Sequence, residues 1–171
     1  DAFKLALQKK SNLKMILVPR HPKRMKEIAN LLKKHNFKYS VRSRNETPSL
    51  NNQIYLADTI GELPLWYSSC AITFVAGSLL PVGGHTPYEP NLFSSAIIHG
   101  PYFSNFEDTY NELNKNQAAI KVSSPKQISA AWEKLRNKKF RDTTISNAKN
   151  IFNKSNKKEE LMNCIFEKLQ N

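Results

Sequence analysis

The sequence predicts an α/β fold, a Rossmann-like, doubly wound parallel sheet of about six strands with extra C-terminal helices. Short apolar segments alternate with segments of helical periodicity, which is the pattern of parallel strands joined by helices. The apolar segments are continuously hydrophobic, as expected for strands covered on both faces. Polar and glycine-rich motifs follow directly after these segments, where a parallel sheet binds its ligands.

The first part of the chain is expected to be a linker or helix end at 1–13, then three strands and two helices. The strands are short apolar segments bounded by polar residues, proline or glycine. The first helix carries Met25, Ile28, Leu31 and Leu32 on one face. We expect strands at 14–18, 37–41 and 54–56, helices at 23–35 and 58–68, and an exposed loop at 42–53.

The second part is expected to contain three more strands and five helices. Gly100 and Pro101 turn the chain after the fifth strand, and Pro125 suits the first position of a helix. The strands stop near residue 140, so the last two helices are expected to pack on the sheet or on a domain outside this chain. We expect strands at 71–75, 96–98 and 118–122, and helices at 87–93, 105–114, 125–135, 142–155 and 158–169.

Length and composition indicate a globular protein. The chain has 171 residues, of which 40% are hydrophobic and 10% aromatic, enough for one domain or slightly more with a real core. No apolar run approaches the roughly 20 residues of a membrane helix, and no signal peptide is visible. The chain begins at Asp1 in helix-like sequence, and we therefore expect a piece of a longer protein.

The net charge of +12 favours anionic partners. The lysines are spread along helices rather than clustered with aromatic residues, which weakens a nucleic-acid interpretation and favours solvated basic faces for most of them. Cys70 and Cys164 lie far apart and the histidines lack zinc-site spacing, so we expect reduced thiols, no metal and no cofactor.

The most informative stretch is GSLLPVGGHTPYEP at 77–90, between an expected strand and an expected helix. Glycine allows close backbone approach to a ligand, and a helix N-terminus can hold phosphate or sugar hydroxyls. His85 can donate to such a ligand. A Gly-Gly turn without a ligand is the simpler alternative.

Arg20 and His21 follow the first expected strand. A guanidinium makes paired hydrogen bonds to phosphate or carboxylate, and an imidazole can donate to a phosphate oxygen or a sugar hydroxyl. The alternatives are a surface arginine and a histidine that fixes the loop.

Two Thr-x-x-Glu patterns, Thr59 to Glu62 and Thr86 to Glu89, fit capping boxes at helix starts. The functional alternative for Glu89 is to accept hydrogen bonds from ribose hydroxyls. Pro90 makes this a poor helix start if capping were its only purpose, which favours the ribose interpretation.

Taken together, these motifs resemble the C-terminal half of bacterial 3-deoxy-D-manno-octulosonic acid (Kdo) transferases. The resemblance rests on VPRHPKR at 18–24, DTIGEL at 58–63, FVAGSLLPVGGHTPYEP at 74–90 and GPYFSNFED at 100–108. It implies half of a two-Rossmann (GT-B) glycosyltransferase, with 14–140 as the nucleotide-sugar-binding domain and 141–171 as C-terminal helices. This half would hold the donor, CMP-Kdo. An N-terminal half outside this chain would hold the lipid A precursor, the membrane anchor and the carboxylate base.

The resemblance also implies roles by motif position. Arg20 would contact the CMP phosphate or the donor carboxylate, and Glu89 would hold the ribose. The nucleotide pocket would include Gly61 and Glu62, and the loop around phosphate and sugar would consist of Gly77, Ser78, Gly83, Gly84 and His85. The family commonly has asparagine where this chain has Thr86, which keeps an acceptor but loses the amide donor. No catalytic residue is expected in this chain.

The resemblance places the full protein at the cytoplasmic face of the bacterial inner membrane, where basic residues would favour the anionic surface. Two other functions stay open. One is the donor domain of another GT-B transferase or a sugar-nucleotide epimerase, which would prefer a uridine nucleotide. The other is a non-catalytic basic module for RNA or protein, which would bind RNA in a salt-sensitive manner.

Overall fold

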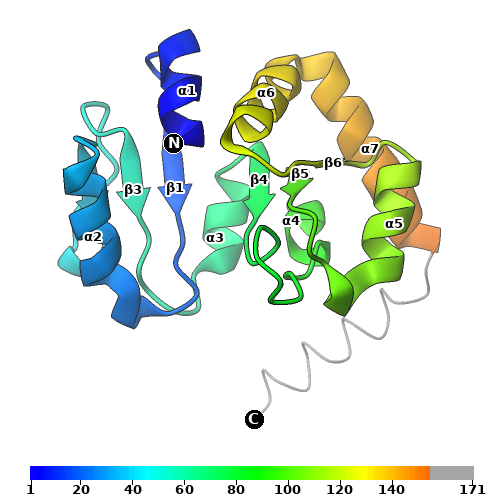
Figure 1. Ribbon diagram of the computed structural model, residues 1–171, viewed down its shortest axis with the longest axis horizontal. Coiled ribbons are helices and arrows are strands. Elements are labelled where there is room, and N and C mark those ends of the chain that lie inside the picture. Colours follow the sequence, from blue (N-terminus) through cyan, green and yellow to red (C-terminus); the bar gives the residue numbers. More distant parts are fainter. Residues whose placement is uncertain (155–171) are drawn as a thin grey trace. The chain divides into compact units, whose positions relative to one another are not determined.

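The computed structural model describes residues 1–154 (Figure 1). The chain divides into two compact units, with the boundary between Cys70 and Ala71. Each unit has its own three-stranded parallel sheet. The α/β class and the parallel strands predicted from the sequence are therefore confirmed, with the strands divided between two sheets.

The first unit is built on the sheet β1-β3-β2. Its strands pair in register, with Met15 and Tyr39 both opposite Ile54 of the central strand. The central strand is buried throughout, and Trp66 packs under it with Tyr55 and Ala57. The elements are α1 (Ala2–Lys9), β1 (Met15–Leu17), η1 (Pro22–Arg24), α2 (Met25–Lys34), β2 (Tyr39–Val41), η2 (Arg42–Arg44), β3 (Ile54–Leu56) and α3 (Leu63–Ser68).

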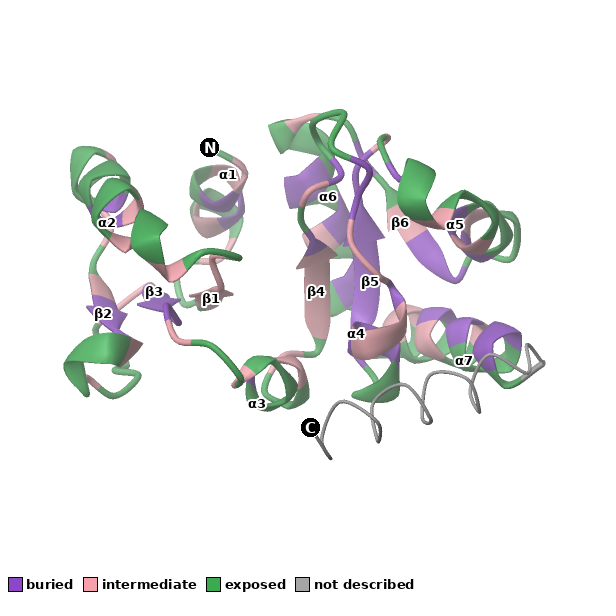
Figure 2. Cartoon of the chain, turned by 90° about the horizontal axis from the view of Figure 1, so that it is seen from below, coloured by how far each residue is buried: buried purple, intermediate pink, exposed green. Residues whose placement is uncertain are grey.

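The second unit is built on the sheet β4-β5-β6, and its central strand is buried along its whole length (Figure 2). Ile97 packs in one apolar cluster with residues of α5 and α7, whereas Ala96 and Ile98 pack in another with residues of α6. Side chains alternate along a strand, so both faces of this sheet are covered. The elements are β4 (Ile72–Val75), α4 (Tyr88–Leu92), β5 (Ala96–His99), η3 (Ser104–Phe106), α5 (Glu107–Lys115), β6 (Ala119–Lys121), α6 (Pro125–Arg136) and α7 (Lys138–Lys154).

All six predicted strands are present, and most helices lie where periodicity placed them. The helix expected from residue 58 begins only at Leu63, because Gly61 has a positive φ of 85° that a right-handed helix does not allow. The helix expected from residue 142 begins at Lys138, where Oδ1 of Asn137 accepts from the Phe140 amide at 3.0 Å and caps the helix.

Two other expectations concern the ends of the chain. Residues 2–9, expected to be a linker or helix end, form the helix α1. The helix expected at 158–169 and Cys164 lie outside the described residues, and the domain boundaries at 13 and 140 stay predictions. Within residues 1–154, no helix has the length and apolar character that crossing a membrane requires.

Candidate functional site

The loop between β4 and α4 depends on three glycines. Gly77, Gly83 and Gly84 have φ angles of 75°, 91° and 76°, in a region that other residues rarely adopt. The loop closes on itself, because the amide of Gly84 donates to the carbonyl of Gly77 at 3.0 Å. The His85 ring covers Gly77 so closely that a Cβ on Gly77 would lie 3.0 Å from two ring atoms. The loop is thus a closed turn lined by backbone and one imidazole.

Ser78 fixes the base of this loop. Its side chain is fully buried, and its Oγ donates to the carbonyl of Val75 at 2.6 Å and accepts from the amide of Gly100 at 2.7 Å. Its carbonyl accepts from the amide of Tyr102 at 2.9 Å. Ser78 therefore ties the end of β4 to the segment that follows β5. Its part in donor binding stays a prediction, and its hydroxyl is already engaged inside the protein.

Tyr110 holds the other side of the loop from inside the core. It is fully buried on α5, and its hydroxyl donates to the carbonyl of His85 at 2.9 Å. The ring packs on His99, with centroids 4.3 Å apart. Nδ1 of His99 bonds to the carbonyl of Gly100 at 2.8 Å, and Nε2 lies 2.9 Å from Oδ1 of Asn114. The loop is thus supported from the core by the buried side chains of Tyr110 and His99.

Neither Tyr110 nor Asn105 was among the residues predicted from the sequence. The backbone N–H of Asn105 donates to the carbonyl of Gly83 at 3.0 Å, and the Asn105 side chain fills the space beside Gly83. Both residues act through contacts distant in sequence. The only local signal that could have indicated Tyr110 is its helical spacing from Leu113, the other buried residue of α5.

The start of α4 carries the remaining predicted residues of this unit. Oγ1 of Thr86 accepts from the amide of Tyr88 at 3.3 Å, two residues along rather than the three of a capping box. Glu89 lies in the first turn and is partly buried, as are His85 and Thr86. A carboxylate there benefits from the positive end of the helix dipole. This unit thus brings together seven of the predicted residues, namely Gly77, Ser78, Gly83, Gly84, His85, Thr86 and Glu89.

The other four predicted residues lie in the first unit, after β1 and β3. Arg20 and His21 are exposed between β1 and η1. Gly61 is exposed, and no atom lies within 4 Å of where its Cβ would stand. Both segments follow the carboxyl ends of parallel strands, where α/β sheets bind ligands.

Glu62 has a partner that the sequence did not suggest. Nη2 of Arg42 donates to Oε1 at 2.6 Å, and Nε lies 3.1 Å from each carboxylate oxygen. The hydroxyl of Thr59 donates to Oε2. The hydrogen bonds from Arg42 and then from Thr59 lower the pKa of Glu62 from 4.5 to about 2. The Thr59–Glu62 capping box is therefore not formed: Glu62 makes no side-chain cap bond to α3 and pairs with Arg42 instead.

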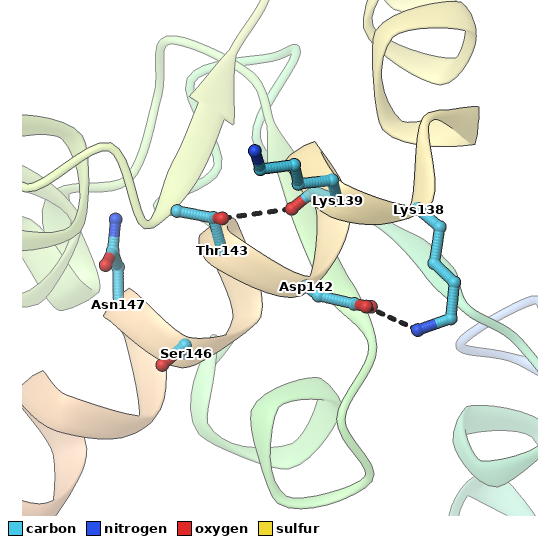
Figure 3. A pocket seen from close by; sticks show the side chains of 6 residues that line it. All are labelled: Lys138, Lys139, Asp142, Thr143, Ser146 and Asn147. Atoms are coloured by element: carbon cyan, nitrogen blue, oxygen red, sulfur yellow. Dashed lines mark hydrogen bonds and ion pairs between the residues drawn. The ribbon is translucent and has the colours of Figure 1, made fainter.

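An open hollow of about 630 Å³ lies elsewhere, along α7 (Figure 3). All the residues that line it are polar, and two of them, Lys138 and Asp142, already pair with each other at 2.5 Å. None of the predicted site residues is among those that line it, which are Lys138, Lys139, Asp142, Thr143, Ser146 and Asn147. Among residues 1–154, no cluster of three or more histidine, cysteine or acidic side chains could hold a metal ion.

The parallel α/β units and the glycine-rich loop after β4 agree with the C-terminal domain of a GT-B glycosyltransferase, and a solved structure of such a domain shows that the chain is of this class. The crystal structure of the C-terminal CMP-Kdo binding domain of WaaA from Acinetobacter baumannii matches with a TM-score of 0.84 and 30% identity, over 88% of this chain and 79% of that one. The chain belongs to the 3-deoxy-D-manno-octulosonic acid transferase family.

Curated relatives agree with this assignment. The 3-deoxy-D-manno-octulosonic acid transferase of Haemophilus influenzae is 41% identical over 143 residues, which are 83% of this chain and 34% of the relative. That of Rickettsia prowazekii is 40% identical over 114 residues, or 67% of this chain and 24% of the relative. The chain thus spans about a third of one of these relatives and about a quarter of the other. No family model matches it.

Proposed function

We propose that this chain is the donor-binding domain of a Kdo transferase and that it binds CMP-Kdo. The observation that carries the proposal is the braced loop between β4 and α4, in a chain 30% identical to a CMP-Kdo binding domain. Such a loop presents backbone to a ligand without rearranging, because its inner hydrogen bonds are already made.

The proposed roles follow from the chemistry of each side chain. Arg20 neutralises the CMP phosphate or the donor carboxylate with paired hydrogen bonds, and His21 adds a donor. The glycine-rich loop and His85 surround the phosphate and the sugar, and Glu89 accepts from the ribose hydroxyls. Gly61 and Glu62 line the nucleotide pocket. Stabilising the departing CMP in this way lowers the barrier to transfer.

The complete reaction is the transfer of Kdo from CMP-Kdo to a lipid A precursor. In this proposal the acceptor and the base that activates its hydroxyl are held by the part of the relatives that this chain does not span. This chain by itself binds the donor and does not catalyse transfer.

Calorimetry with CMP, UMP and UDP tests the proposal. We expect CMP to bind most tightly, and Arg20→Ala and Glu89→Gln each to weaken it by about tenfold, or 1.4 kcal/mol. Arg136→Gln serves as a matched control, because it removes an arginine whose guanidinium pairs with Glu133 on α6. Preference for a uridine nucleotide would instead indicate another GT-B transferase or an epimerase. Tight, salt-sensitive binding of RNA without CMP binding would indicate a basic binding module.

A contact with the anionic inner membrane at its cytoplasmic face is a second part of the proposal. The net charge of +12 supports it, since each basic residue near an anionic surface contributes roughly 1 kcal/mol. Sedimentation with vesicles of anionic and of neutral lipid tests it. We expect binding to the anionic vesicles alone, weakening as salt is raised, and binding that ignored salt would contradict it.

A further inference from the structure

The segment from Asp58 to Glu62 is fixed at both ends by the segment that follows β2. At one end, the amide and the hydroxyl of Ser43 donate to the two carboxylate oxygens of Asp58 at 2.9 and 2.7 Å. Asp58 is only 5% exposed. At the other end, Arg42 and Thr59 hold the carboxylate of Glu62. Arg42 and Ser43, two neighbouring residues of η2, thus bind the two ends of one five-residue segment.

The tip of this segment, Ile60 and Gly61, packs on almost nothing. Ile60 is 83% exposed, and the space around a Cβ on Gly61 is empty to 4 Å. Gly61 also has a φ of 85°, which requires the segment to turn sharply there. Packing therefore does not set the conformation of the tip. The hydrogen bonds of Ser43 to Asp58 and of Arg42 to Glu62 set it.

The ion pair between Arg42 and Glu62 is less exposed than another surface ion pair of this unit, between Arg24 and Glu27. The Arg42 and Glu62 side chains are 40% and 25% exposed, whereas those of Arg24 and Glu27 are 59% and 66% exposed. An ion pair that is less exposed contributes more to stability, and Glu62 also accepts from Thr59 in addition to Arg42. The hydrogen bonds from Arg42 and Thr59 lower the pKa of Glu62 to about 2, so the pair stays ionised even in moderately acidic solution.

From this geometry we propose that Arg42 is a positioning residue: through Glu62 and Thr59 it fixes the tip at Ile60–Gly61 in the conformation that receives the donor nucleotide. This inference rests on the proposed donor-binding function. Arg42 need not touch the nucleotide. An apolar side chain and a bare glycine backbone, held out in solvent by charged partners, are suited to contact a ligand that arrives from outside.

The test is calorimetric binding of CMP by the full chain with Arg42→Gln, Glu62→Gln and Thr59→Val. We expect the dissociation constant to rise by about tenfold for the first two and less for the third, while the free energy of unfolding falls by too little to populate unfolded chain at the assay temperature. Arg136→Gln, which breaks another arginine–glutamate pair, should change it by less than about twofold.

Two further measurements separate positioning from a merely structural role. Amide hydrogen exchange at residues 59–61 should accelerate in Arg42→Gln, while exchange in β3 stays slow. The double variant Arg42→Glu with Glu62→Arg should bind CMP more tightly than either charge-reversed single variant, because it restores the pair in reverse.

The outcomes distinguish this inference from the function it rests on. Wild-type chain that fails to bind CMP overturns the proposed function and this inference with it. Wild-type chain that binds CMP, with Arg42→Gln binding equally well, overturns the inference alone. A loss of affinity that only follows a loss of global stability also overturns it.

Discussion

Ser78 and Gly100 form a single joint, in which the hydroxyl of Ser78 accepts from the amide of Gly100 at 2.7 Å. They are 22 residues apart in sequence, Ser78 after the partly buried strand β4 and Gly100 directly after the buried strand β5. The backbones approach so closely that a Cβ on Gly100 would lie 2.0 Å from the carbonyl oxygen of Ser78. The glycine-rich loop and the turn after β5 are therefore packed together and should move together.

Ser78→Ala should lower the free energy of unfolding by about 1–3 kcal/mol, because it leaves the buried amide of Gly100 without its acceptor. Urea denaturation measures this change. Ser69→Ala is the matched control, since Ser69 Oγ donates to a backbone carbonyl at 2.7 Å on an exposed helix end. Equal effects of the two substitutions would contradict the bracing role of Ser78.

Gly100→Ala should be more severe, with a loss of about 3 kcal/mol or more, because backbone rather than a side-chain end must move. Gly61→Ala is the informative comparison. Gly61 has a positive φ but open space around it, so its substitution should cost only about 1 kcal/mol of backbone strain. If thermal and urea unfolding ranked the two in the opposite order, the close approach at Gly100 would be wrong.

Tyr110→Phe should weaken CMP binding several-fold and lower stability by about 1–2 kcal/mol, since the carbonyl of His85 loses its donor. Calorimetry and denaturation together check this. Tyr88→Phe removes a hydroxyl that lies 3.3 Å from Thr109 Oγ1 and leaves the loop carbonyls untouched. It should change both quantities less, and an equal effect on CMP binding would refute the claim that Tyr110 supports the loop.

The pKa of Glu62 predicts a pH dependence. It is about 2 in the folded protein against 4.5 for the free group, so the unfolded chain binds the proton more readily. The stabilisation is complete above about pH 4.5 and is lost as pH falls through about 2. The advantage of wild type over Glu62→Gln in melting temperature should therefore shrink over that range. An advantage that stayed constant down to about pH 2 would be the contrary result.

His99 predicts a second dependence near neutral pH. Burial lowers its pKa below the usual 6.5, an effect that the hydrogen bonds to Asn114 and Gly100 partly oppose. The unfolded chain therefore binds more protons at and below about pH 6.5, and stability should fall as the solution is acidified from about pH 7.5 to 5.5. His99→Gln should flatten this slope, measured by denaturation at each pH.

The sequence predicted the strands well because each is a short apolar segment with a clear boundary. It placed seven predicted residues on one loop and helix start because they are neighbours in the chain. It predicted neither Arg42 as the partner of Glu62, 20 residues away, nor Tyr110 as the donor to His85, 25 residues away. Such contacts depend on strand order, which local patterns do not encode. The Thr59–Glu62 pattern suggested a cap for the same reason, since the competing arginine is distant in sequence.

The two ends of the glycine-rich loop are held by hydrogen bonds, and the side chains between them are exposed. Gly77, Ser78, Gly83 and Gly84 are held by hydrogen bonds, whereas Leu80 and Val82 between them are each 67% exposed. For protein engineering, residues 79–82 are therefore positions at which substitutions should be tolerated. Their side chains can be replaced to alter what this edge of the molecule contacts, while the frame that carries them keeps its geometry.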